Sequence, residues 1–345
     1  MSGDAPPAAS SAAASSVAAS MAAASPPAGS SLAHLPVTLF SAVMGLAGTS
    51  LAWRRAAKVW SLPSWPSSVL LAVAVVAFLV VAFAYAAKWL RHPAAARAEL
   101  RHPIRMTFVP TTTIALLLLA TGLTTVAPGV AAVLWWVGAL GHLTLTVVVL
   151  SAWFGRADIV HTSVTPAWFI PIVGNVVTPL AAAEVGSIEL AWFSFGVGLV
   201  FWVGLFPLLL QRVLVHDAPL PARLLPTLAI FIAPTAVAVV AWSVLTGDAS
   251  GPVPRILWAA ALMFALLLGA QIGLLRTIPF ALPYWAYTFP LAALTVATFV
   301  LAGATSGLGY GIIAGVLLAV TTVLVVLVLV RTIALAARGE LLRPE

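Results

Sequence analysis

The sequence predicts an all-α membrane protein with ten transmembrane helices, arranged as five helical hairpins. Composition is the first reason: 62% of the 345 residues are hydrophobic and 7% are charged, whereas about a quarter of residues are charged in soluble domains. Length is the second reason, since ten spans of about 20 residues each fit the chain. The third reason is the distribution of proline, which alternates from one apolar run to the next.

Ten apolar runs, separated by loop signals, define the predicted helices. They are 35–54, 66–90, 105–126, 130–152, 166–184, 188–214, 221–245, 253–275, 281–303 and 308–335. The connections after the odd-numbered runs are mostly short, such as "APG" at 127–129, so consecutive helices are expected to pair as hairpins. Together they predict one ten-helix transmembrane domain at 34–337.

Two segments flank this domain. Residues 1–33 are mostly Ala, Ser and Pro, with one acid and no base, and they lack the charged and apolar regions of a signal peptide. Such small side chains cannot bury enough surface to offset chain entropy, so a disordered tail is expected. Residues 338–345 are predicted to form a short cytoplasmic tail.

The basic residues indicate the orientation of the chain. With a cytoplasmic N-terminus, twelve of the sixteen Lys and Arg residues face the cytoplasm, and the remaining four (Arg54, Arg55, Lys58 and Arg255) lie outside. The positive-inside rule therefore predicts an inner (plasma) membrane protein with both termini in the cytoplasm. A topology with an odd number of spans is the alternative.

The sequence argues against an enzyme. All nine acidic residues lie in the tail, the loops or the helix ends, cysteine is absent, and no His pair has the spacing of a metal site. We expect no catalytic residue, no metal, no cofactor and no nucleic-acid partner. His142 is the only histidine deep in an apolar run. It is either an ionisable functional group or a neutral imidazole hydrogen-bonded to a neighbouring helix.

Proline and polar residues gather in the odd-numbered runs, whereas carboxylates are absent from the spans. Proton-coupled carriers and cation pathways rely on buried acids, so both are disfavoured. The alternation of proline predicts an inner ring of five Pro-kinked helices around a pore, although prolines are also common in membrane helices generally. The pore-lining or kink candidates from this pattern are Pro36, Pro110, Pro171, Asn175, Pro234, Thr288 and Pro290.

Six stretches, in this order, resemble the tellurite-resistance/dicarboxylate transporter family. They are "LPVTLFSAVMGLAGTSLAW" (35–53), "RHPIRMTFVP" (101–110), "TPAWFIPIVGNVV" (165–177), "FPLLLQRV" (206–213), "IAPTAVAV" (232–239) and "PYWAYTFPLAALTVAT" (283–298). That family includes bacterial tellurite-resistance membrane proteins, malic acid transporters and the slow anion channels of plant guard cells. The resemblance extends over nearly all of 35–335.

The resemblance implies a quasi-fivefold ring of kinked helices, a homotrimer with one pore in each subunit, and a phenylalanine gate on the ninth helix. The matching residue here is Phe289. Ser41, after Phe40, stands where many relatives have a glycine beside the gating ring, and Val237 matches an apolar pore-lining position. Arg105, in the basic turn, has either a functional role or only a topological one.

The function expected on this basis is passive permeation of small anions through a channel in the lipid bilayer. Hydroxyl groups of four threonines, Thr38, Thr111, Thr227 and Thr288, are expected to replace water around the anion. The alternatives are a secondary transporter of dicarboxylates, sulfite or tellurite, and a membrane scaffold without flux.

Overall fold

The computed structural model describes residues 31–215, 219–305 and 307–342. Over these residues the chain forms helices and no strands. Most of the predicted N-terminal tail and the last three residues of the predicted C-terminal tail lie outside the described residues. By length and composition, nine helices of the described chain are apolar enough to cross a membrane. The regular structure of the described chain is therefore all helical, as the composition predicted.

Five long helices form the periphery of the bundle. They are α3 (Trp65–Arg91), α6 (Pro128–Gly155), α9 (Ile188–Leu214), α11 (Pro252–Ala270) and α14 (Leu308–Ala337). Between 11% and 33% of their most apolar segments is buried, and large side chains such as Phe83, Val200 and Ile256 are about 70% exposed. Apolar faces of this extent are typical of helices that contact lipid.

A second set of helices lies inside the first. It consists of α2 (Phe40–Trp60), α5 (Thr111–Leu123), α7 (Ile170–Val177), α10 (Ala233–Thr246) and α13 (Thr288–Ala304). The most apolar segments that contain the last four are 72% to 78% buried. Helix α2 is also mostly buried but is not among the nine apolar spans, and it carries Arg54, Arg55 and Lys58 near its end.

Each of these buried helices begins as a 3-10 helix and then becomes an α-helix. The 3-10 segments are η2 (Val37–Leu39), η3 (Arg105–Phe108), η5 (Pro166–Phe169), η7 (Ala222–Ile232) and η8 (Leu282–Tyr287). Four of the predicted prolines lie at these transitions, namely Pro110, Pro171, Pro234 and Pro290, whereas Pro36 directly precedes η2. Proline has no N–H and is tolerated in the first turn of an α-helix, where that N–H would have no partner. In four of the five buried helices, a proline therefore marks the position of the transition.

The remaining short elements lie in connections or interrupt a helix. They are η1 (Leu32–His34), α4 (Pro93–Arg101), η4 (His161–Ser163), η6 (Thr178–Ala181), α8 (Ala182–Val185) and α12 (Ile272–Leu275). The fifth predicted span, 166–184, is thus divided into η5, α7, η6 and α8, with Pro179 in the second residue of η6. The predicted eighth span is divided in the same way into α11 and α12.

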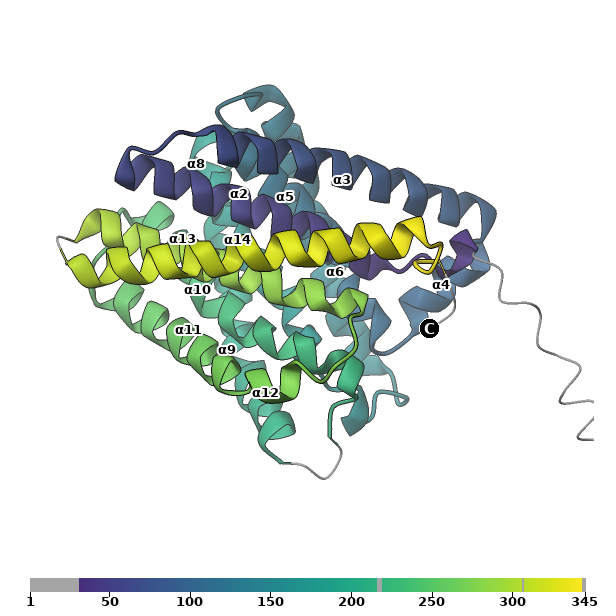
Figure 1. Cartoon of the computed structure of the whole chain (residues 1–345). Helices are drawn as coiled ribbons and strands as arrows, with labels where there is room; N and C mark the ends of the chain where they lie inside the picture. The colour runs from purple at the N-terminus through teal and green to yellow at the C-terminus, as the bar shows by residue number, and fades with distance from the viewer. Residues whose placement is uncertain (1–30, 216–218, 306, 343–345) are drawn as a thin grey trace, which may run out of the picture.

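The buried helices contact one another in a closed order. Helix α2 packs against α5, α5 against α7, α7 against α10, α10 against α13, and α13 against α2. Each also packs against the peripheral helix that follows it in the chain, and Figure 1 shows α2 lying between α3 and α14. Near the start and end of the described chain, the Ser31 N–H donates to the Leu342 carbonyl at 3.1 Å. These two ends therefore meet at the same end of the bundle.

Candidate functional site

Two cavities lie one after the other among the buried helices. Helices α2, α5, α10 and α13 contribute to both, whereas α7 lines the first and η6, which follows α7, lines the second. The first cavity lies at the level of the 3-10 to α transitions and is lined, among others, by Ser41, Thr111, Val173, Ala233 and Phe289. The second cavity is lined, among others, by Leu51, Leu118, Leu180, Val237 and Val296. On each helix the second set lies farther along the chain, so the cavities follow one axis.

Phe289 lies between these cavities. Of the described residues, it is the one that lines both. It is the second residue of α13, its side chain is 8% exposed, and Pro290 follows it in the first turn. Phe289 thus borders both cavities where they approach each other.

Two glycines on α2 allow α13 to approach closely at this point. A Cβ atom on Gly45 would lie 2.1 Å from Oγ1 of Thr288, and one on Gly48 would lie 3.3 Å from Cδ2 of Phe289. Small residues permit such close contact between membrane helices. The two positions, three residues apart, lie against Thr288 and Phe289, which are successive residues of α13.

The other predicted site residues divide into two groups. Ser41, Val237 and Pro290 line a cavity, whereas Phe40 does not. Phe40 packs edge-on against Phe78 and Tyr85 of α3, with ring centroids 5.9 and 6.0 Å apart. Phe40 therefore anchors the start of α2 to the periphery.

The threonine hydroxyls are largely engaged with the backbone. Those of Thr111, Thr227 and Thr288 donate to carbonyls three residues earlier, at 2.6, 2.6 and 2.7 Å. Thr227 and Thr288 line neither cavity, whereas Thr38 and Thr111 line the first one. Because a hydroxyl has one hydrogen, Thr111 presents lone pairs rather than a donor to the cavity.

His142 of α6 lies behind the wall of the first cavity. Its Nδ1 is 2.8 Å from Oγ1 of Thr113, and its Nε2 is 3.2 Å from the Pro171 carbonyl. A Cβ atom on Gly174, which lines that cavity, would lie 2.0 Å from Cε1 of His142. The imidazole is fully buried and joins α5 and α7, which agrees with the hydrogen-bonded alternative from the sequence.

Asn175 belongs to the same cluster. Its Nδ2 donates to Oγ1 of Thr146 at 2.9 Å and to the Pro171 carbonyl at 3.3 Å. Asn175 lines neither cavity, and its amide instead connects α7 to α6. The cluster therefore holds the start of α7, around Pro171, against a peripheral helix.

A buried ion pair holds the peptide groups on either side of Pro36. Glu99 of α4 accepts hydrogen bonds from Nζ of Lys88 at 2.8 Å and from the Val37 N–H at 2.9 Å. Lys88 also donates to the Leu35 carbonyl at 2.7 Å. Both charged side chains are about 5% exposed. The pair fixes the entry of the chain into η2, directly before Thr38, which lines the first cavity.

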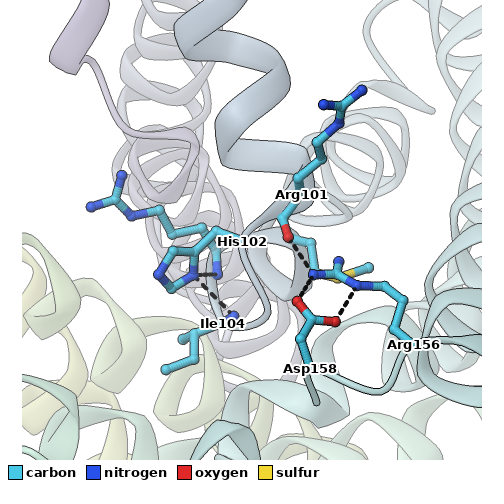
Figure 2. A network of polar contacts seen from close by, with 7 residues as sticks. Arg101, His102, Ile104, Arg156 and Asp158 are labelled. Atoms are coloured by element: carbon cyan, nitrogen blue, oxygen red, sulfur yellow. Dashed lines mark hydrogen bonds and ion pairs between the residues drawn. The ribbon is translucent and has the colours of Figure 1, made fainter.

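Basic residues cluster at the end of the bundle where the buried helices begin. Figure 2 shows Arg156 contacting Asp158 and the Arg101 carbonyl, and the Arg156 to Arg101 distance is 2.7 Å. In the same view Nδ1 of His102 accepts the N–H groups of Ile104 and Arg105, at 3.1 and 3.2 Å. These contacts shape the turn that leads into η3.

The charges in this cluster act on each other. Partial burial, and then the positive charges of Arg105, Arg223 and Arg156, lower the pKa of His102. The hydrogen bond from Arg156 is the main reason why the pKa of Asp158 is lowered. Arg105 and Arg223 lie in the 3-10 starts of two buried helices, so positive charge surrounds this end of the cavity axis.

Sequence reasoning did not single out Gly48, Gly174, Lys88 or Glu99. One signal for Gly48 was present in the sequence, because "MGLAGTS" places Gly45 and Gly48 three residues apart on one helix face. This spacing does not indicate which helix packs there. Glu99 lies in a stretch that the sequence analysis assigned to a loop, and α4 buries it. In the described chain, no group of three or more His, Cys, Asp or Glu side chains is placed to hold a metal ion.

A helical bundle with apolar peripheral faces and an axis of uncharged cavities defines a multi-pass membrane protein. A family model described as voltage-dependent anion channel matches residues 34–333, and the chain belongs to this family. It is also the family named for the guard-cell channel, which the sequence motifs had indicated.

Individual relatives are similar over most of this chain. The S-type anion channel SLAH3 of Arabidopsis thaliana is 29% identical over 309 residues, which cover 88% of this chain and 48% of SLAH3. The guard cell S-type anion channel SLAC1 of the same plant is 26% identical, and the match covers 91% of this chain and 58% of SLAC1. The tellurite resistance protein TehA homolog of Haemophilus influenzae is 28% identical, and the match covers 75% of this chain and 79% of that homolog. The chain therefore spans about half the length of these plant relatives.

Proposed function

We propose that this protein is a channel that passes small anions passively through a pore within each subunit, and that Phe289 closes the pore. One observation carries the proposal: α2, α5, α10 and α13 line two successive cavities, α7 and then η6 complete the two linings, and Phe289 is shared by both. An aromatic ring at such a constriction excludes water and ions, and apolar constrictions of this kind gate by dewetting. The relatives named as anion channels support the same function.

The charge distribution favours anions over cations. In the described chain no charged side chain lines either cavity, so a permeating cation would meet no carboxylate. The basic cluster around His102 lies where the buried helices begin, and charge of one sign at the mouth of a low-dielectric passage concentrates ions of the opposite sign. A dicarboxylate carrier would need fixed cationic donors at its substrate, and the cavities hold none.

The topology that fits this function has ten crossings in five hairpins, with α2 added to the nine apolar spans. An even number of crossings places both termini on one side, and the contact between Ser31 and Leu342 supports that arrangement. The basic residues then favour the cytoplasmic side of the plasma membrane for both termini. The homotrimer rests on the family resemblance, and the apolar periphery provides surface for lipid and for neighbouring subunits.

Efflux from proteoliposomes tests the proposal. Vesicles loaded with chloride or malate would be diluted into impermeant-anion buffer, with valinomycin and potassium setting the voltage, for wild type and Phe289→Ala. A passive channel predicts anion efflux that follows the voltage, increases strongly in Phe289→Ala and is unaffected by a pH gradient. Uptake of malate, sulfite or tellurite against its gradient, driven by protons, would favour the carrier instead.

A further inference from the structure

Two arginines lie at the end of the bundle opposite the His102 cluster, beyond the second cavity. Gly48 and Leu51 of α2 line that cavity, and Arg54 and Arg55 follow Leu51 by three and four residues. Residues at these spacings share one face of an α-helix. Along the helix axis, Arg55 lies about 6 Å beyond Leu51. This distance is shorter than the screening length of about 8 Å at physiological ionic strength, so the charge of Arg55 acts on an ion at the end of the cavity.

Arg54 is fixed in place by the end of α5. Its Nη2 donates to the Thr121 carbonyl at 2.8 Å, and its Nη1 donates to the Gly122 carbonyl at 3.2 Å. These carbonyls lie three and four residues beyond Leu118, which lines the second cavity from α5. The guanidinium therefore spans two pore helices just beyond the cavity. Carbonyl dipoles reduce its positive potential but do not cancel its charge.

Arg55 is partly buried and, in the described part of the chain, forms no ion pair within 4 Å. Glu184, four residues beyond Leu180 of the second cavity lining, is the acid whose negative charge acts on both arginines. Glu184 is exposed, so solvent screens it more than the guanidinium groups. Neither α10 nor α13 carries a charged residue, and two positive charges therefore face one negative charge.

We propose that Arg54 and Arg55 form an anion-binding site at this second mouth, and that Arg55 is the group that raises the local concentration of the permeating anion. The site rests on the proposed channel function and adds a selectivity element on the far side of Phe289. An anion that enters the apolar passage loses hydration, and a fixed cation about one turn away offsets part of that loss. Arg54 positions the site, because its guanidinium is committed to α5.

The experiment measures currents in planar bilayers with Phe289→Ala as the open parent. The test variant adds Arg55→Gln, and the matched control adds Arg255→Gln, which removes an exposed arginine from the first turn of peripheral α11, just after α10 ends. At about 0.1 M chloride we expect Arg55→Gln to lower the conductance for chloride entering from this mouth about threefold. At about 1 M chloride the difference should vanish, because the screening length is then about 3 Å.

Arg55→Lys keeps the charge and should conduct like the parent, and each variant must elute as a monodisperse protein. Conductance unchanged by Arg55→Gln at low salt, or lowered equally by Arg255→Gln, would overturn the site while leaving the channel intact. An absence of anion current in the Phe289→Ala parent would overturn the channel and this site together. The two failures are therefore distinguishable.

Discussion

The aromatic ring of Phe289 lies against Gly48, so that a Cβ atom on Gly48 would be 3.3 Å from Cδ2 of the ring. Both residues line the second cavity, one from α13 and the other from α2. At this contact the α2 side of the cavity therefore has no side chain, and the space next to the ring depends on both positions.

A large side chain at Gly48 should replace the missing ring in an opened channel. In a Phe289→Ala background, we expect Gly48→Leu to reduce the anion current close to the wild-type level, because the leucine fills the space that the ring vacated. Gly204→Leu is the control, since nothing lies within 4 Å of a Cβ atom at Gly204 of α9. Current that persists in the Gly48→Leu variant would show that ions pass elsewhere.

Gly174 should tolerate no side chain while His142 is present. A Cβ atom there would lie 2.0 Å from Cε1 and 2.3 Å from Nε2 of the imidazole, and overpacking of this kind costs about 1–3 kcal/mol. We expect Gly174→Ala to lower the thermal unfolding temperature in detergent. In a His142→Ala background, where the imidazole is missing, Gly174→Ala should lower the unfolding temperature by less than it does in wild type. Equal destabilisation by Gly174→Ala in both backgrounds would contradict this contact.

The pair of Lys88 and Glu99 should be costly to break and much less costly to remove. Glu99→Gln leaves the buried ammonium of Lys88 without a counter-charge, which typically costs about 3–5 kcal/mol. Lys88→Met/Glu99→Gln leaves no buried charge and should be more stable than Glu99→Gln alone. Unfolding curves in a graded detergent mixture measure both effects. A double variant less stable than Glu99→Gln alone would contradict this prediction, because the remaining contact of Lys88 with the Leu35 carbonyl would then outweigh the cost of its unpaired charge.

His102 should make the protein less stable as the pH falls. Its pKa is lowered in the folded protein, so above the ordinary value of about 6.5 the imidazole is neutral in both states. As the pH falls through that value, the unfolded chain takes up the proton first, and the free energy of unfolding decreases until the folded pKa is passed. Protonation of Nδ1 would also remove the acceptor for the Ile104 and Arg105 N–H groups.

His102→Asn separates the charge from the hydrogen bonds. An asparagine side chain accepts backbone N–H groups two residues on, as in an Asx-turn, but does not titrate. We expect the variant to lose less thermal stability than wild type between pH 7.5 and pH 5, and to match wild type near pH 7.5. His102→Leu, which lacks the acceptor, should be less stable at both values. If His102→Asn lost as much thermal stability as wild type between pH 7.5 and pH 5, the loss would belong to other titratable groups.

Much of the architecture was predictable from local patterns in the chain. Composition and apolar run lengths predicted a helical membrane protein, and the alternation of proline separated the buried helices from the peripheral ones. The reason is physical: proline is tolerated in the first turn of an α-helix. Pro110, directly before α5, and Pro171 and Pro234, in the first turns of α7 and α10, therefore mark where the 3-10 segments end. Phe289 was singled out by its resemblance to a family motif rather than by any property of the residue itself.

Contacts between distant segments were not predictable in the same way. Phe40 and Asn175 have the residue types expected near a pore, yet one packs on α3 and the other bonds to Thr146 of α6. Sequence alone gives the face of a helix only approximately, and it does not name the partner on another helix. Gly174 could not be recognised for the same reason, because its role depends on an imidazole that belongs to a peripheral helix.

The most direct test of the central account is the current through single proteins in planar bilayers, for wild type and Phe289→Ala, under a tenfold chloride gradient. The account predicts small or absent currents for wild type and large currents for Phe289→Ala, with a reversal potential close to the chloride equilibrium potential. Phe40→Ala is the control, because that ring lines neither cavity and its removal should not open the pore. Equal currents in wild type and Phe289→Ala, or a reversal potential near that of the cation, would contradict the account.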